Sequence, residues 1–222
     1  MFTAYTRQVE RVKRVVDAGA EEVVDGGRTR YHHGDLPAAL IAAGLELTRT
    51  GGPDALSLRE IARRVGVSPN AAYRHFASRD AILAAVSREI EAAMAARMVD
   101  SGALNSPASG RDLLRAVGMG YIEFALAEPG WFAVAFFSGM DDDPARVESS
   151  PAYGALAYAL DTMVSGGELE PARRAQAQWP CWAAVHGFAE LALVGPLRFV
   201  ERDELTVLAR RTVDTVIEGL CR

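Results

Sequence analysis

Helical periodicity dominates the hydrophobic pattern of this 222-residue chain. Beyond residue 79, no stretch sustains the alternation of apolar and polar positions that a strand shows, and periodic stretches of helical length alternate with clusters of Gly, Pro, Ser and Asp. The pattern predicts an all-α protein, with helices in this part of the chain at about 80–99, 109–128, 130–137, 151–165, 171–195 and 202–220.

A short helix is predicted to open the segment 28–80. Asp35 is a favourable N-cap, Pro37 falls in the first turn, and apolar residues follow at helical spacing. Two glycines and a proline at 51–53 end the helix.

Two further helices follow, with a tight turn between them. Ser57 with Glu60 three residues later predicts a capping box, in which each side chain satisfies a free backbone N–H of the other residue. After the Val-Gly-Val sequence at 65–67, Ser68 can cap a third helix that begins with proline. Two short capped helices joined by three residues with a central glycine form the helix-turn-helix pattern.

Charge is unevenly distributed along the chain. The formal net charge of −5 makes nucleic acid a poor partner on the total alone. However, residues 28–80 hold eight Arg and five acidic residues, for a charge of +3, while residues 81–222 hold twelve Arg and nineteen acidic residues, for −7. A small basic segment joined to a large acidic one is typical of a nucleic-acid-binding module with an attached domain.

Compartment and covalent chemistry are simple to predict. The apolar stretch at about 183–195 is broken by a polar residue and is shorter than the roughly 20 residues of a membrane span. The first residues lack an apolar core and a cleavage site, so we expect an unprocessed cytoplasmic protein with no membrane partner. Cys181 and Cys221 are too few for a disulfide framework or a metal cluster.

Two sets of motifs resemble a known family. The first set is Leu58-Arg59-Glu60-Ile61-Ala62, Val65-Gly66-Val67-Ser68, Tyr73-Arg74-His75-Phe76 and Arg79, which resembles the DNA-binding domain of the tetracycline-repressor (TetR) family of bacterial regulators. Trp182-Ala183-Ala184-Val185-His186-Gly187 resembles the Trp…His-Gly signature of the WHG type of C-terminal domain in that family. Tyr31-His32-His33-Gly34-Asp35-Leu36 resembles the same subgroup.

The resemblance implies an architecture and a mode of action. Residues 1–27 are expected to be an extension, partly helical or disordered, 28–79 a helix-turn-helix DNA-binding domain, and 80–222 a helical ligand-binding and dimerisation domain. The last two predicted helices are apolar on more than one face, which suits a homodimer. We therefore expect a repressor that binds a palindromic double-stranded operator and releases it when a small, largely apolar ligand binds.

DNA contacts are predicted at both ends of the helix-turn-helix. Arg59 suits guanine and ranks first for specificity, while Asn70 and Ala71 can reach base edges. Phosphate contacts are implied for Ser57, Ser68, Tyr73, His75 and Arg79, and backbone or minor-groove contacts are expected for Arg30, His32 and His33, with Arg74 as a further candidate. Each of these residues also has an alternative role that does not involve DNA. Ser57 and Ser68 could act as helix caps alone, Tyr73 could be a half-buried core ring, Arg74 could be a solvated side chain, and His32 and His33 could belong to a linker.

The ligand pocket is expected in the larger part of the chain. Candidate lining residues are Tyr121, Phe124, Trp131, Phe132, Phe136, Phe137, Met140, Tyr153, Met163, Trp179, Trp182 and His186. Gln178, Trp182 and His186 share one helical face and can orient a ligand carbonyl or hydroxyl. A buried histidine satisfied by a neighbouring group explains His186 equally well.

Movement is expected at two kinds of position. The helix that starts at Arg79 is the expected lever between the two domains. Gly118, Gly120, Gly130 and Gly139 are expected to give neighbouring helices room to move.

Enzymatic readings are weak. The aspartate run at 141–143 has no second acidic cluster that would complete a magnesium site, so a solvated loop is favoured. No nucleophile elbow, phosphate-binding loop or Cys/His cluster is present, so we expect no catalytic residue and no cofactor. The alternative class is a helical small-molecule-binding protein or enzyme with a vestigial helix-turn-helix.

Overall fold

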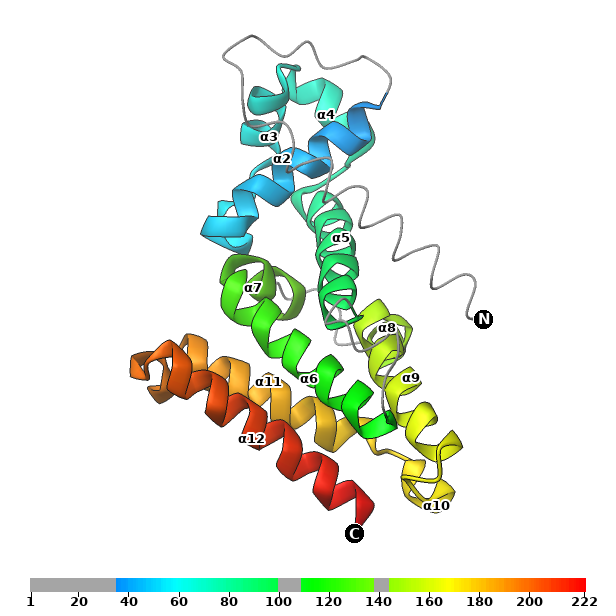
Figure 1. Cartoon of the computed structure of the whole chain (residues 1–222). Coiled ribbons are helices and arrows are strands. Elements are labelled where there is room, and N and C mark those ends of the chain that lie inside the picture. The colour runs from blue at the N-terminus through cyan, green and yellow to red at the C-terminus, as the bar shows by residue number, and fades with distance from the viewer. Residues whose placement is uncertain (1–34, 100–108, 138–143) are drawn as a thin grey trace. The chain divides into compact units, whose positions relative to one another are not determined.

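The computed structural model describes residues 35–99, 109–137 and 144–222, and in these residues every regular element is a helix (Figure 1). The prediction of an all-α protein is confirmed. The chain divides into two compact units, one of residues 1–93 and 128–142 and the other of residues 94–127 and 143–222.

The first unit contains the predicted helix-turn-helix. Its described elements are α2 (Leu36–Gly51), η1 (Pro53–Ala55), α3 (Leu58–Val65), α4 (Pro69–His75), most of α5 (Arg79–Val99) and α7 (Pro129–Phe137). Its core is aliphatic, because Leu40, Leu56, Ile61, Ile82 and Val86 are at most 2% exposed. Burial of these side chains supplies the main stabilisation of this small unit.

Two of the three expected caps are present. Asp35 accepts a hydrogen bond from the backbone N–H of Ala38 at 3.2 Å, and Ser68 accepts one from Ala71 at 3.2 Å. The capping box predicted for Ser57 and Glu60 is wrong, because the Ser57 side chain makes no capping bond.

Glu60 is instead held by arginines of its own helix. It accepts from Arg63 at 2.7 and 2.8 Å and from Arg64 at 3.0 Å, one turn further along α3. Two guanidinium groups at the i+3 and i+4 positions compete better for the carboxylate than a single backbone N–H does. These bonds lower the pKa of Glu60 to about 2.

Helix α7 packs against α2, although 79 residues separate the paired side chains Arg49 and Glu128. Arg49 donates from Nε to Glu128 at 2.7 Å, and its guanidinium lies 5.1 Å from the ring centroid of Trp131. The Trp131 indole donates to the backbone oxygen of Leu45 at 2.9 Å, and Phe132 is 1% exposed. The sequence predicted the helix at 130–137 but placed it in the ligand-binding domain.

The second unit is built around α6 (Gly110–Ala127), which packs against three of its other helices. The remaining elements are α8 (Pro144–Ser149), α9 (Pro151–Ser165), α10 (Pro171–Arg174), α11 (Gln178–Leu193), η2 (Pro196–Phe199) and α12 (Arg202–Cys221). α6 lies beside α9, α11 and α12, so each of these helices buries one face against it (Figure 1). Glu168 fixes its start by accepting from the N–H groups of Gly110 and Arg111 at 2.6 and 3.1 Å.

The helix predicted at 171–195 is two helices. α10 ends at Arg174, and Gln176 adopts φ 63° before α11 begins at Gln178. A non-glycine residue at positive φ interrupts the helical hydrogen-bond ladder. Periodicity alone did not reveal this break, because apolar spacing continues through it.

Three of the four glycines expected to allow movement instead allow close packing. A Cβ on Gly120 would lie 2.7 Å from the Cα of Met98, and a Cβ on Gly118 would lie 3.2 Å from Val213. A Cβ on Gly130 would collide with the backbone oxygens of α2 at Thr48. These glycines therefore fix helix approaches, while Gly139 lies outside the described residues.

Candidate nucleic-acid interface and ligand pocket

The helix-turn-helix is closed by one glycine. Gly66 has φ 78°, a left-handed conformation that glycine adopts without steric cost. The N–H of Val67 then donates to the backbone oxygen of Ala62 at 2.9 Å, which ends α3 and turns the chain into α4. Buried Ile61 and Ala72 lie between the two helices.

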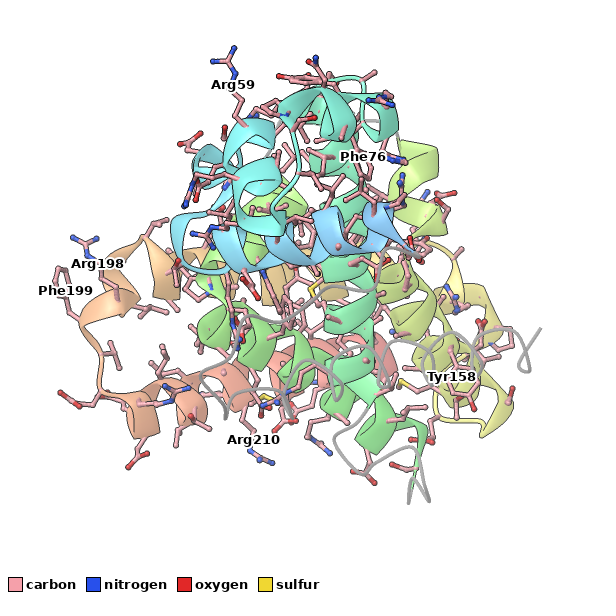
Figure 2. The ribbon with its side chains drawn as sticks, turned by 90° about the horizontal axis from the view of Figure 1, so that it is seen from above. Arg59, Phe76, Tyr158, Arg198, Phe199 and Arg210 are labelled. Carbon is pink, nitrogen blue, oxygen red and sulfur yellow. The ribbon has the colours of Figure 1, made fainter. Side chains whose placement is uncertain are left out.

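Polar side chains remain exposed on α3 and α4. Within residues 35–99, the side chains of Arg59, Asn70, Arg74 and His75 are exposed and take part in no hydrogen bond or ion pair. Arg59 extends away from the ribbon of α3 (Figure 2). Exposed guanidinium, amide and imidazole groups can replace their hydrogen bonds to water with hydrogen bonds to base edges and phosphates.

The remaining predicted DNA contacts on these helices are also at the surface. Tyr73 is 45% exposed, so its ring is accessible at the surface. Ser57 and Ser68 are exposed, and Ala71 is half-buried on the first turn of α4. Arg30, His32 and His33 lie outside the described residues.

Arg79 makes hydrogen bonds to the backbone of its own unit that the sequence did not predict. Its Nε donates to the backbone oxygen of Leu56 at 3.1 Å, and one of its terminal nitrogens donates to that of Pro53. It thereby ties the start of α5 to η1, next to the N-terminus of α3. Part of its donor capacity is used within the unit before any phosphate is bound.

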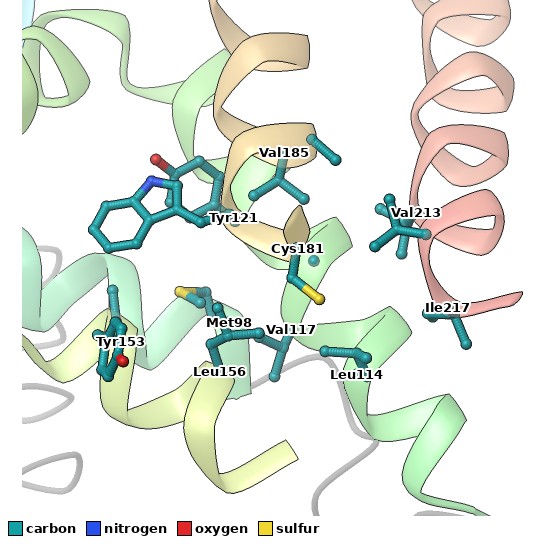
Figure 3. Close-up of a pocket in the computed structure, with 15 residues that line it drawn as sticks. Met98, Leu114, Val117, Tyr121, Tyr153, Leu156, Cys181, Val185, Val213 and Ile217 are labelled. Atoms are coloured by element: carbon teal, nitrogen blue, oxygen red, sulfur yellow. The ribbon is translucent and has the colours of Figure 1, made fainter. Parts of the chain in front are cut away.

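A pocket opens inside the second unit, with a volume of about 550 Å³ that includes the space at its mouth (Figure 3). Five helices contribute to its wall. The lining residues are Met98, Leu114, Val117, Gly118, Tyr121, Ala152, Tyr153, Leu156, Cys181, Trp182, Ala184, Val185, Val213, Val216 and Ile217. Such an apolar wall suits a small organic molecule.

A polar cluster stands at one side of this pocket. The Tyr121 hydroxyl and His186 Nδ1 are 2.8 Å apart, and the Trp182 side chain also hydrogen-bonds to that hydroxyl. Since an indole can only donate, the hydroxyl accepts from Trp182. Burial raises the pKa of Tyr121 far above its usual range and lowers that of His186, so both are neutral.

Comparison with known families assigns most of the chain. Residues 40–86 match the family described as bacterial regulatory proteins of the tetR family, and residues 114–216 match the tetracyclin repressor-like C-terminal domain. The chain belongs to the TetR family. It is therefore a DNA-binding transcriptional regulator that responds to a ligand, and the alternative of a vestigial helix-turn-helix is not favoured.

Solved structures agree with this fold. A protein of unknown function from Rhodococcus sp. RHA1 is 28% identical, with a TM-score of 0.66 over 88% of this chain and all of that one. A TetR variant from Acinetobacter baumannii AYE in complex with minocycline is 22% identical, with a TM-score of 0.59 over 82% and 94%. FadR from Bacillus subtilis in complex with stearoyl-CoA is 15% identical, with a TM-score of 0.63 over 82% and 98%. No curated protein matches the chain significantly.

The TetR chain brings only some of the predicted ligand residues to its pocket. Tyr121, Tyr153 and Trp182 line it, and His186 stands behind the wall, bonded to Tyr121. Trp179 is 45% exposed and stacks on Trp182 with ring centroids 6.2 Å apart.

The other candidates lie elsewhere. Trp131, Phe132 and Phe136 belong to α7, which packs on α2 in the first unit, and they do not line the pocket. Phe124 and Met163 are buried within the second unit but do not line the pocket, and Gln178 accepts from Arg174 at 3.2 Å. Met140 and the side chain of Phe137 lie outside the described residues.

The aliphatic part of the wall is absent from the predicted set, which consists of aromatic residues, two methionines, a glutamine and a histidine. Val213, Val216 and Ile217 occupy one face of α12 at i, i+3 and i+4 spacing, as Leu114 and Val117 do on α6. This spacing was visible in the sequence. What the sequence could not show is that the two faces are opposed across a space.

Metal binding and membrane insertion are two further possibilities for the described residues. No group of three or more potential metal-ligating side chains comes together there. None of the helices there has the length and hydropathy needed to cross a lipid bilayer.

Proposed function

We propose that this TetR family chain is a repressor that binds a pseudo-palindromic operator as a homodimer and leaves it when a small, largely apolar molecule fills the pocket. The observation that carries the proposal has two parts. The exposed side chains of Arg59, Asn70 and Arg74 in one unit make no hydrogen bond or ion pair with the residues that the structure describes, and the other unit contains an apolar pocket. TetR regulators are typically not enzymes, and we assign this chain no catalytic residue and a cytoplasmic place of action, where operator DNA lies.

The dimer is assigned to the last two helices and the turn between them. Leu191, Val194, Phe199 and Val207 are exposed by 46, 74, 77 and 65%. Large apolar side chains exposed together along neighbouring elements favour an interface with another protein. A two-fold axis through this surface would present two helix-turn-helix units to half-sites about 34–36 Å apart.

Two segments connect the pocket to the DNA-binding unit. α5 begins at Arg79 beside α3 and ends next to the pocket wall at Met98. α6 lines the pocket and is followed directly by α7, which is tied to α2 through Glu128 and Trp131. If a ligand favours one arrangement of α5 and α6, it changes the affinity for DNA by the same factor by which DNA changes the affinity for the ligand.

The experiment is a fluorescence-anisotropy titration of labelled DNA from upstream of the gene, at several salt concentrations, with a random duplex of equal length as control. We expect specific binding that weakens steeply with salt, at two protomers per site. Equal affinity for both duplexes would contradict the proposed regulator. Binding of a single protomer would contradict only the dimer.

A further inference from the structure

Among the residues that the structure describes, the wall of the pocket carries no acidic, basic or imidazole side chain. Its fifteen lining residues come from α5, α6, α9, α11 and α12, and none of them is Asp, Glu, Lys, Arg or His. In Figure 3 the rings of Tyr121 and Tyr153 lie on one side and the aliphatic side chains of Val213 and Ile217 on the other. A ligand therefore meets hydrocarbon on both sides.

The few polar atoms of the wall are neutral, and two of them are already engaged. The Tyr121 hydroxyl is bonded to both His186 and Trp182. Burial raises the pKa of the Cys181 thiol to about 11, so it stays protonated. No wall residue offers a cationic partner to a carboxylate or a phosphate.

The charged residues that act on the polar groups of the wall, Glu190 and Arg174, offer an anion no unbalanced positive charge. Burial lowers the pKa of His186 and raises that of Tyr121, and the carboxylate of Glu190 opposes the first change and adds to the second. Arg174 acts on Cys181, but its Nε donates to Asp161 at 2.7 Å, so its charge is largely balanced. An anion entering this site would lose its hydration without gaining a partner.

We propose that the pocket selects uncharged, mainly hydrocarbon molecules and rejects anions, so that its ligands differ in class from a carboxylate or an acyl-coenzyme A. This inference rests on the proposed ligand-controlled function and specifies its ligand. A neutral polar group such as a hydroxyl is compatible with this wall, because the polar groups of its described residues are hydroxyls, an indole and a thiol. Burial of the hydrocarbon supplies the affinity.

The test uses three compounds with the same eight-carbon chain and different charge. Octan-1-ol, octanoate and octyltrimethylammonium are titrated at pH 8 against the full-length protein loaded with the uncharged dye Nile red, and dye displacement is followed by fluorescence. We expect octan-1-ol to displace the dye at a concentration at least tenfold lower than octanoate, with octyltrimethylammonium also weaker than the alcohol.

A matched pair of variants locates the binding. Ala152 lines the pocket and is 8% exposed, while Ala157, five residues later on α9, is half-buried and does not line it. We expect Ala152→Leu to weaken octan-1-ol binding several-fold and Ala157→Leu to leave it unchanged. Circular dichroism melts of both variants check that they fold.

Each outcome decides the proposal. Octanoate or octyltrimethylammonium binding as tightly as the alcohol, or tighter, would overturn it if Ala152→Leu weakens that binding too. No displacement by octan-1-ol, or no dye binding at all, would also overturn it. The DNA titration is run on the same preparation, so specific DNA binding without alcohol binding removes the ligand class and leaves the regulator intact.

Discussion

On α3 and α4, the side chains of Arg59 and Asn70 are exposed and take part in no hydrogen bond or ion pair among the described residues. In the pocket, by contrast, the polar atoms of Tyr121 and Trp182 are bonded to each other. The first surface keeps its hydrogen-bonding capacity for a partner. The second has used most of it internally and offers apolar area. One chain thus recognises DNA by pairing polar groups and a small molecule by burying hydrocarbon.

The largest expected effect breaks the first half of this comparison. Arg59→Ala should reduce the preference for operator over random DNA by about 1–3 kcal/mol per half-site, because a guanidinium fork reads guanine. The ratio of the two dissociation constants, measured by anisotropy, tests this. Arg173→Ala removes an exposed arginine from the second unit and should leave the ratio unchanged. A parallel loss in both variants would mean that Arg59 contributes charge and not specificity.

The next effect concerns packing beside the pocket. Gly120→Ala should lower the free energy of unfolding by about 1–3 kcal/mol, since its Cβ would lie 2.7 Å from the backbone of Met98. Gly154→Ala is the control, because its Cβ would meet no atom within 4 Å and α9 should gain up to about 1 kcal/mol from the better helix former. Urea unfolding of both variants measures the difference. Equal stabilisation by both would show that α5 and α6 do not approach closely at Gly120.

A smaller effect tests the internal bonding of the pocket. Tyr121→Phe should cost about 1–2 kcal/mol, because it removes one buried partner from Trp182 and one from His186. Tyr153→Phe removes a hydroxyl from the same pocket wall and should change stability by less than about 0.5 kcal/mol. Thermal melts of the two variants give the comparison. If the two variants lose the same amount of stability, the hydrogen bonds of the Tyr121 hydroxyl do not stabilise the fold.

The smallest effect is a pH dependence. Burial lowers the pKa of His186, so the folded protein binds fewer protons at this imidazole than the unfolded chain does. Its stabilising contribution is therefore complete above the unfolded pKa of about 6.5 and is lost as the pH falls through the folded pKa. We expect the Tm of His186→Gln to change less than that of the wild type between pH 7.5 and pH 5.5. A steeper dependence in the variant would contradict the assigned neutral state.

Local signals in the sequence predicted the helices well. Asp35 and Ser68 begin α2 and α4, and Gly66 ends α3, because caps and turns depend on residues within a few positions of each other. The Ser57 box failed for the same local reason, since Arg63 and Arg64 took the Glu60 carboxylate.

Contacts between distant segments were not predictable in this way. The bond from Trp131 to Leu45 joins residues 86 positions apart, and nothing in the periodicity of either helix identifies its partner. The same limit applies to the pocket, where the role of the Trp182 and His186 pair became clear only with Tyr121 between them. The resemblance of Trp182…His186-Gly187 to the WHG signature is a resemblance in sequence alone.

Helix α7 also affects how such regulators can be recombined. The first unit is discontinuous, since residues 128–137 return to pack on α2 after the chain has entered the second unit. A chimeric regulator that joined residues 1–93 of this protein to the sensor of a relative would inherit a foreign α7 facing Arg49 and Leu45. Exchange of sensors should therefore succeed more often when the donor of α2 also donates α7.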